Sequence, residues 1–288
     1  MYAQPPRIIM TLGALVIFLH PTVASAHQPR IPTNNPVIVV DPEISKAYYG
    51  TMQGDPVTYR IESEVPFALY VNVLVPDILG QKKDVSVAVI KNGDIDHAVA
   101  LLEATGASWK KFYEPFGADT YWKGPEYKAQ VRPGLYEVKV WSSNNDSTYS
   151  LAIGEKEQFD LAETINALHL IPTIKQRFFH ESPATFIFSV FGMAYVAVMF
   201  VLGFLLGYAY RWILKSFAHG AGRAASKNIG LRDRLVRAGI ALGLFIWAIT
   251  TTWSAWLLFF AGLALFEAIF SWCGFYAAMG RNTCVVGE

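Results

Sequence analysis

Cysteine is almost absent from this 288-residue chain, whose only two cysteines, Cys273 and Cys284, lie close to the C-terminus. A fold built by the preceding residues therefore does not rely on disulfide bonds. Two thiolates also supply too few ligands for a structural zinc site within one chain. The pair leaves three interpretations open: a packing motif at the end of a membrane helix, a redox pair, or a metal site shared between copies.

Charge is also scarce, since 16% of the residues are charged and the formal net charge is +1. This balance does not support a nucleic-acid partner, which requires a basic face. The sequence contains no nucleotide-binding loop, catalytic triad or multi-histidine metal spacing, so we expect neither an ordinary enzyme nor a cofactor. Hydrophobic residues make up 53% of the chain, and they concentrate at the N-terminus and after Pro183, which predicts a membrane protein with membrane lipid as a partner.

Residues 1–26 have the pattern of a secretory signal. Arg7 precedes a short apolar core from Ile8 to Leu19, and Ala24 to Ala26 form a small-residue cleavage site. We expect cleavage between Ala26 and His27. A retained N-terminal anchor is the alternative.

Residues 27–157 contain short alternating runs rich in Val, Tyr and Ile, separated by turn signals and without intervening helices. This pattern predicts an all-β antiparallel sandwich, jelly-roll-like, on the exported side of the membrane. The predicted strands are PVTYRIES, FALYVNVLV, DVSVAVIK, YKAQV, LYEVKVW and STYSLAIG. The stretch from Leu101 to Tyr127 is less regular, and we expect long loops there with at most one helical turn.

The runs GDPVTYRIE, VPFALYVNVLV and PGLYEVKVWSSNNDSTYSLAIG resemble the bacterial pre-peptidase C-terminal family and other jelly-roll accessory domains. The resemblance implies a binding or accessory module and supplies no catalytic residues. Aromatic and acidic residues in the irregular stretch are the candidates for contacting an unidentified ligand, because loops commonly carry function. Packing of the end of the sandwich is the alternative role for them. The candidates are Trp109, Tyr113, Trp122 and Asp119.

His27 provides a low-probability metal hypothesis. Cleavage after Ala26 makes it the mature N-terminus, and a free amine together with an imidazole chelates copper. His97 is the other histidine within the sandwich region that is available as a second ligand. A disordered first residue is the simpler expectation.

Residues 158–183 have helical spacing and form a predicted amphipathic connector, interrupted or kinked at Pro172. Its predicted apolar stripe consists of Leu161, Ile165, Leu168 and Leu170. Two positions are open for the connector: along the membrane–water boundary, or packed beneath the sandwich.

Residues 184–210 contain no charged side chain, which predicts a transmembrane helix. Residues 211–237 follow as a loop with seven Lys or Arg against one acid, Asp233, and such an excess places a short loop on the cytoplasmic side. Residues 238–284 contain two apolar segments, which we interpret as a helical hairpin that turns near Thr250 to Thr252. Trp253 and Trp256 are then expected at the outer membrane interface and the C-terminus in the cytoplasm.

The basic loop and the hairpin together resemble the YgaP-like inner-membrane domain of bacteria. The matching motifs are KNIGLRDRLVR and CGFYAAMGRNTC, with Gly274 and Arg281 departing from the residues common in the family. Some members carry a rhodanese domain, but its catalytic cysteine belongs to that fused domain and has no counterpart here. The residues that fit the family are Asn228, Gly230, Asp233, Arg234, Arg237, Cys273, Tyr276, Gly280, Asn282, Thr283 and Cys284.

The motif residues predict a polar clasp at the cytoplasmic rim, in which Asp233 and its neighbouring arginines face Asn282 and Thr283. Glu267 lies inside the last apolar segment, where we expect it either neutral or paired with Arg234 or Arg237, because intramembrane acids are costly. The resulting functional hypothesis is a non-catalytic inner-membrane protein, whose sandwich binds a ligand and whose hairpin forms a homo-oligomer or docks to a membrane protein. The alternative is a thiol-redox or sulfur-handling protein that acts through Cys273 and Cys284.

Overall fold

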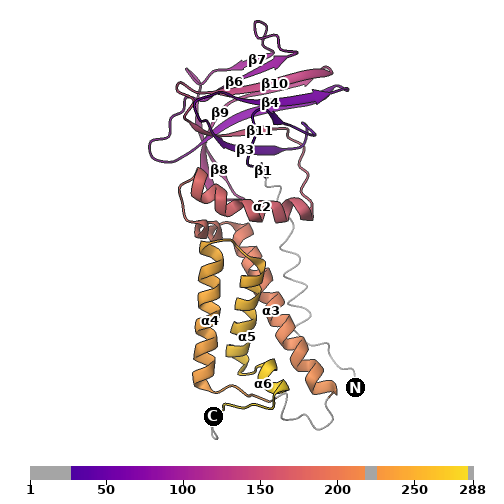
Figure 1. Cartoon of the computed structure of the whole chain (residues 1–288), viewed down its shortest axis with the longest axis vertical. Coiled ribbons are helices and arrows are strands. Elements are labelled where there is room, and N and C mark those ends of the chain that lie inside the picture. The colour runs from indigo at the N-terminus through magenta and orange to yellow at the C-terminus, as the bar shows by residue number, and fades with distance from the viewer. Residues whose placement is uncertain (1–26, 218–225, 285–288) are drawn as a thin grey trace, which may run out of the picture.

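The computed structural model describes residues 27–217 and 226–284. The predicted signal segment 1–26 and part of the basic loop lie outside these residues. A β-sandwich forms one end of the molecule, helix α2 lies crosswise beneath it, and three helices run away from it (Figure 1). The N-terminal region is thus sandwich-like and the C-terminal region helical, as expected.

Two sheets face each other in the sandwich. Sheet A has the order β1-β3-β11-β5-β9-β8 and sheet B the order β2-β4-β10-β6-β7. The strands are β1 (Gln28–Arg30), β2 (Val37–Ile38), β3 (Lys46–Thr51), β4 (Val57–Ser63), β5 (Phe67–Pro76), β6 (Ser86–Lys91), β7 (Ala100–Leu102), β8 (Lys110–Glu114), β9 (Asp119–Val131), β10 (Gly134–Trp141) and β11 (Thr148–Ile153).

Both sheets are mixed, which corrects the expected purely antiparallel arrangement. The edge strand β1 pairs in parallel with β3, and β2 pairs in parallel with β4. The other pairs are antiparallel. Strands β1 and β2 contain three and two residues, too few to produce a visible alternation in the sequence.

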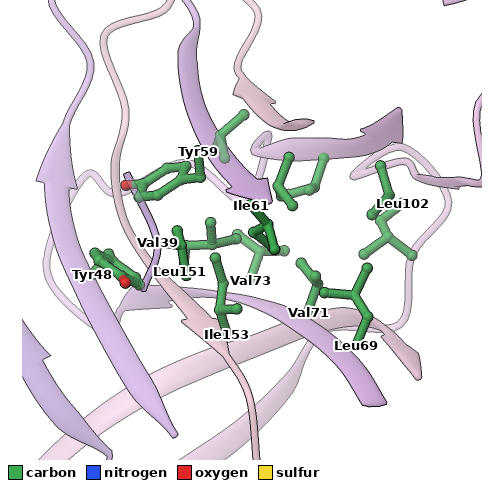
Figure 2. Packing of buried hydrophobic residues seen from close by; sticks show 14 of the residues in the cluster. Val39, Tyr48, Tyr59, Ile61, Leu69, Val71, Val73, Leu102, Leu151 and Ile153 are labelled. Carbon is green, nitrogen blue, oxygen red and sulfur yellow. The ribbon is translucent and has the colours of Figure 1, made fainter. Parts of the chain in front are cut away.

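The core of the sandwich lies between the sheets, where alternate residues of each strand point inward. On β5, for example, Leu69, Val71 and Val73 are fully buried, and Figure 2 shows them packed against Leu151 and Ile153 of β11. The hydroxyl groups of Tyr59 and Tyr149 lie 2.9 Å apart in this core. Their hydrogen bond removes the cost of burying two polar groups.

The stretch from Leu101 to Tyr127 forms strands and not the long loops expected. β8 is an exposed edge strand with the sequence KKFYE, and β9 continues through Gly124 and Pro125. These two residues have the composition of a turn, but they lie beside an irregularity in the β5–β9 register between Asn72 and Leu74. A bulge tolerates Gly and Pro inside a strand, so the turn signal is misleading here.

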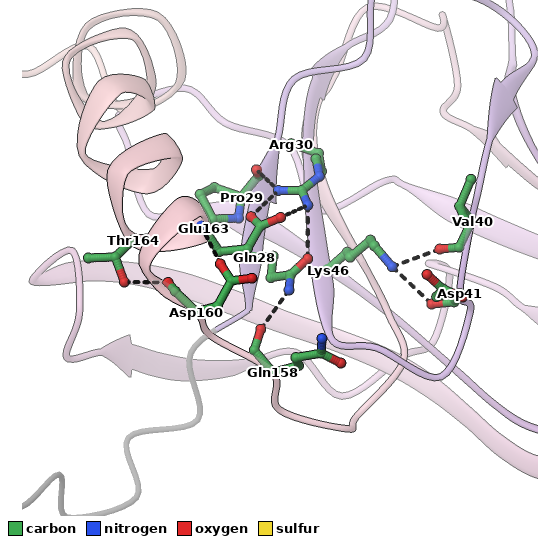
Figure 3. A network of polar contacts seen from close by, with 10 residues as sticks. All are labelled: Gln28, Pro29, Arg30, Val40, Asp41, Lys46, Gln158, Asp160, Glu163 and Thr164. Carbon is green, nitrogen blue, oxygen red and sulfur yellow. Dashed lines mark hydrogen bonds and ion pairs between the residues drawn. The ribbon is translucent and has the colours of Figure 1, made fainter.

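The connector consists of α2 (Leu161–Thr173), a π-helical turn η1 (Ile174–Phe178) and a 3₁₀ helix η2 (Pro183–Phe188). The Asp160 side chain caps α2 by accepting the N–H of Glu163 at 2.8 Å. Glu163 pairs with Arg30 of β1 through two hydrogen bonds of 2.7 and 2.8 Å (Figure 3). The connector therefore packs beneath the sandwich, which was one of the two positions expected.

The predicted apolar stripe of the connector does not form one buried face. Leu161 and Ile165 are exposed, while Ala167 and Ile171 are buried. Leu170 packs with residues of sheet A. Leu168 packs in a different cluster, which includes Phe186, Ala248 and Leu258 of the C-terminal region. Helix α2 therefore has apolar side chains on two opposite sides, a pattern that the stripe alone does not predict.

The C-terminal helices are α3 (Val190–Phe217), α4 (Leu231–Thr250), α5 (Ala255–Phe270) and the short α6 (Gly274–Ala278). Among the described residues, Val190–Ser216 is long and apolar enough to cross a membrane by length and composition, with a mean hydropathy of 2.3. Helix α5 is also apolar but has only 16 residues. The expected number of three spans therefore stays a prediction.

Helix α3 begins six residues later than expected, at Val190 instead of Ala184. The preceding Ser189 has extended backbone angles, and its side chain accepts the N–H of Gly192 at 2.9 Å. Serine is a favoured residue at the start of a helix because its oxygen satisfies a free backbone N–H. The residues before it form η2, which packs on the helices.

Close packing between α3 and α5 depends on glycine. A Cβ atom on Gly203 would lie 2.5 Å from the carbonyl oxygen of Phe259, and one on Gly262 would lie 2.7 Å from the Cα of Phe200. Gly207 likewise lies against the ring of Phe266. The glycine pair Gly203 and Gly207 is therefore used for packing within the chain, as small residues are in membrane helix pairs.

We expect Gly203→Ala to destabilise the helical region by about 1–3 kcal/mol, the usual cost of overpacking. Gly239→Ala on α4 is the matched control, because a Cβ there meets no atom within 4 Å. Thermal unfolding in detergent measures both variants. Equal unfolding temperatures for the two variants would contradict the packing described.

Candidate functional site

A buried ion pair joins the connector to the sandwich. Lys175 of η1 and Asp119 at the start of β9 lie 2.5 Å apart, and their side chains are 1% and 6% exposed. The Lys175 ammonium also lies 5.7 Å from the centre of the Phe179 ring. Asp119 was a candidate ligand-binding residue, but its carboxylate is occupied by Lys175 and is closed to solvent.

The turn between β8 and β9 reaches from this pair to the helices. Glu114 accepts the backbone N–H groups of Phe116 and Gly117, both at 2.7 Å. Burial raises the pKa of the Glu114 carboxyl group above its ordinary value. The ring of Phe116 packs 4.7 Å from that of Phe191 on α3 and 6.0 Å from that of Phe186, so the sandwich itself contacts the helical region.

The turn between α4 and α5 packs against the connector, at the junction between the sandwich and the helices. Trp253 is 2% exposed, and its indole N–H donates to the carbonyl oxygen of Pro183 at 2.9 Å. The hydroxyl of Tyr195 donates to the carbonyl oxygen of Trp253 at 3.2 Å. Trp253 was expected at the membrane interface, but the connector covers it, whereas Trp256 is 71% exposed.

The other predicted ligand residues of the sandwich lie apart from the junction. Trp122 donates to Asp77 at 2.8 Å, and the Lys83 ammonium lies over its ring at 3.2 Å. Trp109 is half-buried against the core, and Tyr113 is 55% exposed on β8. These side chains therefore do not converge on one cavity.

A cleft of about 270 Å³ lies on the outer face of sheet A. Asn72 and Ser150 are buried in it, each 2% exposed. Asn72 donates to the carbonyl oxygens of Gly124 and Pro125, while no hydrogen bond of the Ser150 hydroxyl is found among the described residues. Lining residues include four aromatic side chains and four ionisable ones: Tyr49, Tyr70, Phe112, Tyr121, His27, Glu114, Lys123 and Glu155.

Two tyrosines belong to both the cleft and the connector's docking surface. The hydroxyls of Tyr49 and Tyr121 lie 3.1 Å apart, and the Phe178 ring of η1 packs edge-on against Tyr49 with centroids 5.0 Å apart. The cleft was not found from the sequence. Its signal is the polar Asn72 within the apolar run FALYVNVLV, on the same strand face as Tyr70.

The two histidines of the copper hypothesis lie on different sheets. His27 contacts Ser45 beside β3 of sheet A, and His97 lies in the β6–β7 loop beside Asp94, 3.2 Å away. Burial lowers the pKa of His27. Within residues 27–217 and 226–284, no group of three or more His, Cys, Asp or Glu side chains is placed to hold a metal ion.

At the far end of the helices, Asn228 joins the start of α4 to the end of α5. Its side-chain amide donates to the carbonyl oxygen of Cys273 at 2.9 Å and accepts the Cys273 N–H at 2.8 Å. Its backbone N–H donates to the carbonyl oxygen of Ser271, and its side chain is buried. A single asparagine thus satisfies several backbone groups in the turn after α5.

The clasp residues meet in part as expected. The Thr283 hydroxyl donates to Asp233 at 2.6 Å, and Gly230 donates its N–H to the same hydroxyl at 3.2 Å. Gly230 has no room for a side chain, because a Cβ there would lie 2.4 Å from the Thr283 carbonyl oxygen. Asn282 instead accepts the N–H of Cys284 at 2.8 Å, so it shapes the local turn.

Glu267 pairs with Arg237. Arg234 donates from Nε to the carbonyl oxygen of Ala268 at 2.8 Å. The guanidinium groups of Arg237 and Arg281 lie 5.1 and 4.9 Å from the centre of the Tyr276 ring. Tyr276 therefore sits between two cations, an arrangement that cation–π attraction stabilises.

Cys273 and Cys284 are both free thiols. Cys273 is 2% exposed, beneath the Asn228 contacts, whereas Cys284 is partly exposed. Gly280 has a φ angle of 65°, which glycine adopts without strain and which ends α6 ahead of the Asn282 turn. Burial of Cys273 limits access of any reagent to its sulfur.

We expect Lys175→Met to destabilise the protein by about 3–5 kcal/mol, because it leaves the Asp119 carboxylate buried without a partner. The double variant Asp119→Leu/Lys175→Met removes both charges and is expected to cost much less. Denaturant unfolding of the full chain in detergent gives both values. An equal cost for the single and double variants would show that the ion pair is not coupled.

The same pair predicts a pH dependence. Burial raises the pKa of Asp119 from 3.8 to about 7, although the Lys175 ammonium acts in the opposite direction. Between these two pKa values the folded state binds more protons than the unfolded state, so the free energy of unfolding falls as pH rises. Wild type should therefore lose stability relative to Asp119→Leu/Lys175→Met between pH 5 and pH 7, and parallel curves would refute this.

Comparisons with known proteins agree with the resemblances found in the sequence. A pre-peptidase C-terminal domain of collagenase from Bacillus anthracis is 16% identical, with a TM-score of 0.27, and the match covers 42% of this chain and 94% of that one. The Yersinia pseudotuberculosis-derived mitogen is 18% identical, with a TM-score of 0.26, and the match covers 41% and 91%. Scores this low carry no weight for function, and the sandwich assignment rests on its own strand pairing.

No curated protein matches the sequence. Residues 225–287 match the family model described as inner membrane protein YgaP-like, transmembrane domain. This region contains α4, α5, α6 and the Asn228 and Thr283 contacts. The part of the chain that contains α4, α5 and α6 is therefore similar to the YgaP-like transmembrane domain, and α3 lies outside this match.

Proposed function

We propose that this chain is a bacterial inner-membrane protein whose sandwich binds a ligand outside the cytoplasm, and that it is not an enzyme. The observation that supports this function is the shared wall between the cleft and the connector. Tyr49 and Tyr121 line the cleft and also pack against Phe178 of η1. A ligand in the cleft therefore contacts the surface that holds the sandwich on the membrane helices.

The charge distribution supports the orientation. Seven Lys or Arg and one acid lie between residues 211 and 237, at the end of α3, at the start of α4 and between them. Such an excess in and beside a short loop favours the cytoplasm. Helix α3 then crosses the membrane and leaves the sandwich on the periplasmic side. In this topology the turn at Trp253 is periplasmic, and Cys284 is cytoplasmic.

The helical hairpin is the part that we assign to oligomerisation or to docking of a membrane partner. On α4, Gly239 and Gly243 both face open space, and Ile246 and Trp247 are exposed. Glycines on an open helix face permit another helix to approach closely. Gly203 and Gly207 of α3, by contrast, are already used against α5.

Binding is tested on the full chain in lipid nanodiscs, with a panel of soluble oligosaccharides and short peptides as probes. We expect at least one probe to bind in calorimetry, and Tyr70→Ala to weaken it at least about tenfold through loss of a cleft wall. Tyr113→Ala is the matched control, since Tyr113 is exposed on β8 outside the cleft. Binding that is unchanged in Tyr70→Ala, or no binding by any probe, would count against the cleft.

A second variant distinguishes the binding function from the thiol-redox or sulfur-handling alternative. If the chain is a binding protein, we expect the variant Cys273→Ala/Cys284→Ser to bind the probe with the affinity of wild type. The alternative expects this variant to lose reaction with a sulfane-sulfur donor, measured as persulfide formation at one of the two sites. Persulfide formation in wild type, lost in this variant, would favour the alternative.

A further inference from the structure

Helix α2 has two apolar sides that point in opposite directions. At 3.6 residues per turn, Leu161, Ile165, Leu168 and Pro172 share one side. On the other side, Glu163 pairs with Arg30 of the sandwich, and Leu170 and Ile174 pack with residues of sheet A. The first group therefore points away from the sandwich.

The side that faces away from the sandwich points toward the helical region. Leu168 packs in a cluster with Phe186 and Trp253, which lie where the helices meet the connector. Figure 1 shows α2 lying across this end of the helices, roughly perpendicular to them. Leu161 and Ile165 lie on this same side of α2, about two turns and about one turn before Leu168, respectively.

These extending side chains are exposed. Leu161 is 75% and Ile165 is 48% exposed, although a helix beneath a soluble domain normally presents polar residues to water. Other large apolar side chains are exposed where the helices begin: Phe188 before α3, Val190 at its first residue, and Trp256 in the first turn of α5. Because Leu168 packs with residues near the start of α3, the exposed side of α2 lies at the same end of the helical region as these side chains.

We propose that the exposed side chains of Leu161 and Ile165 on α2 lie on the membrane, in the boundary between headgroups and acyl chains of the leaflet nearest the sandwich. An interfacial helix buries its apolar side at that depth while its axis runs in the plane of the membrane. The crosswise position of α2 over the ends of α4 and α5 in Figure 1 meets this requirement. Lipid is the favoured occupant because the same side of α2 packs through Leu168 with Tyr195 and Val196 of α3, the helix that is long and apolar enough to cross a membrane.

This arrangement sets the height and tilt of the sandwich. The opposite side of α2 is fixed to β1 by the Arg30–Glu163 pair and to sheet A by Leu170 and Ile174. A helix lying on the membrane therefore holds the cleft of sheet A close to the lipid surface. The inference rests on the proposed membrane crossing by α3, and its test separates the two.

The test places a single NBD fluorophore on the full chain in nanodiscs. Cysteine replaces Leu161 or Ile165, both of which are exposed, in a Cys273→Ala/Cys284→Ser background that all labelled variants share. Two labelled controls are Asp96→Cys, in the exposed β6–β7 loop, and Leu205→Cys, exposed on α3. The quenchers are phosphatidylcholine with a doxyl group at acyl carbon 5, and aqueous iodide.

We expect doxyl lipid to quench the label at 161 and 165 at least about threefold more than at 96, with iodide showing the reverse order. Quenching like that at 96 would overturn the proposal, as the helix would then lie in water. Protection from both quenchers would also overturn it, since protein would then cover this side. A lack of doxyl quenching at 205 would instead refute the membrane crossing by α3.

Discussion

The position of the sandwich over the membrane helices depends on a charge pair removed from water. Lys175 and Asp119 are almost completely buried, and neither charge is tolerable in such a place without the other. Apolar packing alone would allow η1 to shift along the outer face of sheet A. The ammonium, by contrast, has one acceptor at hydrogen-bonding distance, so it fixes which turn of the connector meets which end of β9.

The position of η1 determines the other contacts between the sandwich and the helices. Phe178 and Phe179 cover Tyr49 and Tyr121 on sheet A, and η2 is brought over Trp253. The sandwich, the connector and the turn of the YgaP-like hairpin thus share contiguous packing. A domain that is only tethered to a membrane anchor would not require a buried tryptophan at the α4–α5 turn.

The sequence predicted those elements whose periodicity is strong. The alternating runs from Val57 to Ile153 correctly predicted the central strands, and the uncharged stretch 184–210 predicted α3, although the helix begins at Val190. The motif residues located Asn228 and Thr283 near the hairpin ends. In each case one local physical requirement, either burial of one strand face or transfer into lipid, dominated the choice of residues.

The sequence failed where a residue's partner lies far along the chain. Asp119 and Lys175 are 56 positions apart, and nothing near Asp119 distinguishes a buried partner from a ligand-binding acid. Trp253 resembled an interfacial tryptophan because its cover, Pro183, comes 70 positions earlier. The cleft escaped notice for a similar reason, since its residues come from several strands that are ordered in space and not in sequence.

The buried turn at Trp253 also constrains how the protein is assembled. A chain made from its N-terminus completes β9, and then the connector, before the α4–α5 hairpin exists. The turn of the hairpin must therefore pack against a surface that is already formed. A sandwich that folds slowly would leave that turn exposed. The sandwich and the hairpin therefore do not mature independently, although α3 separates them in the sequence.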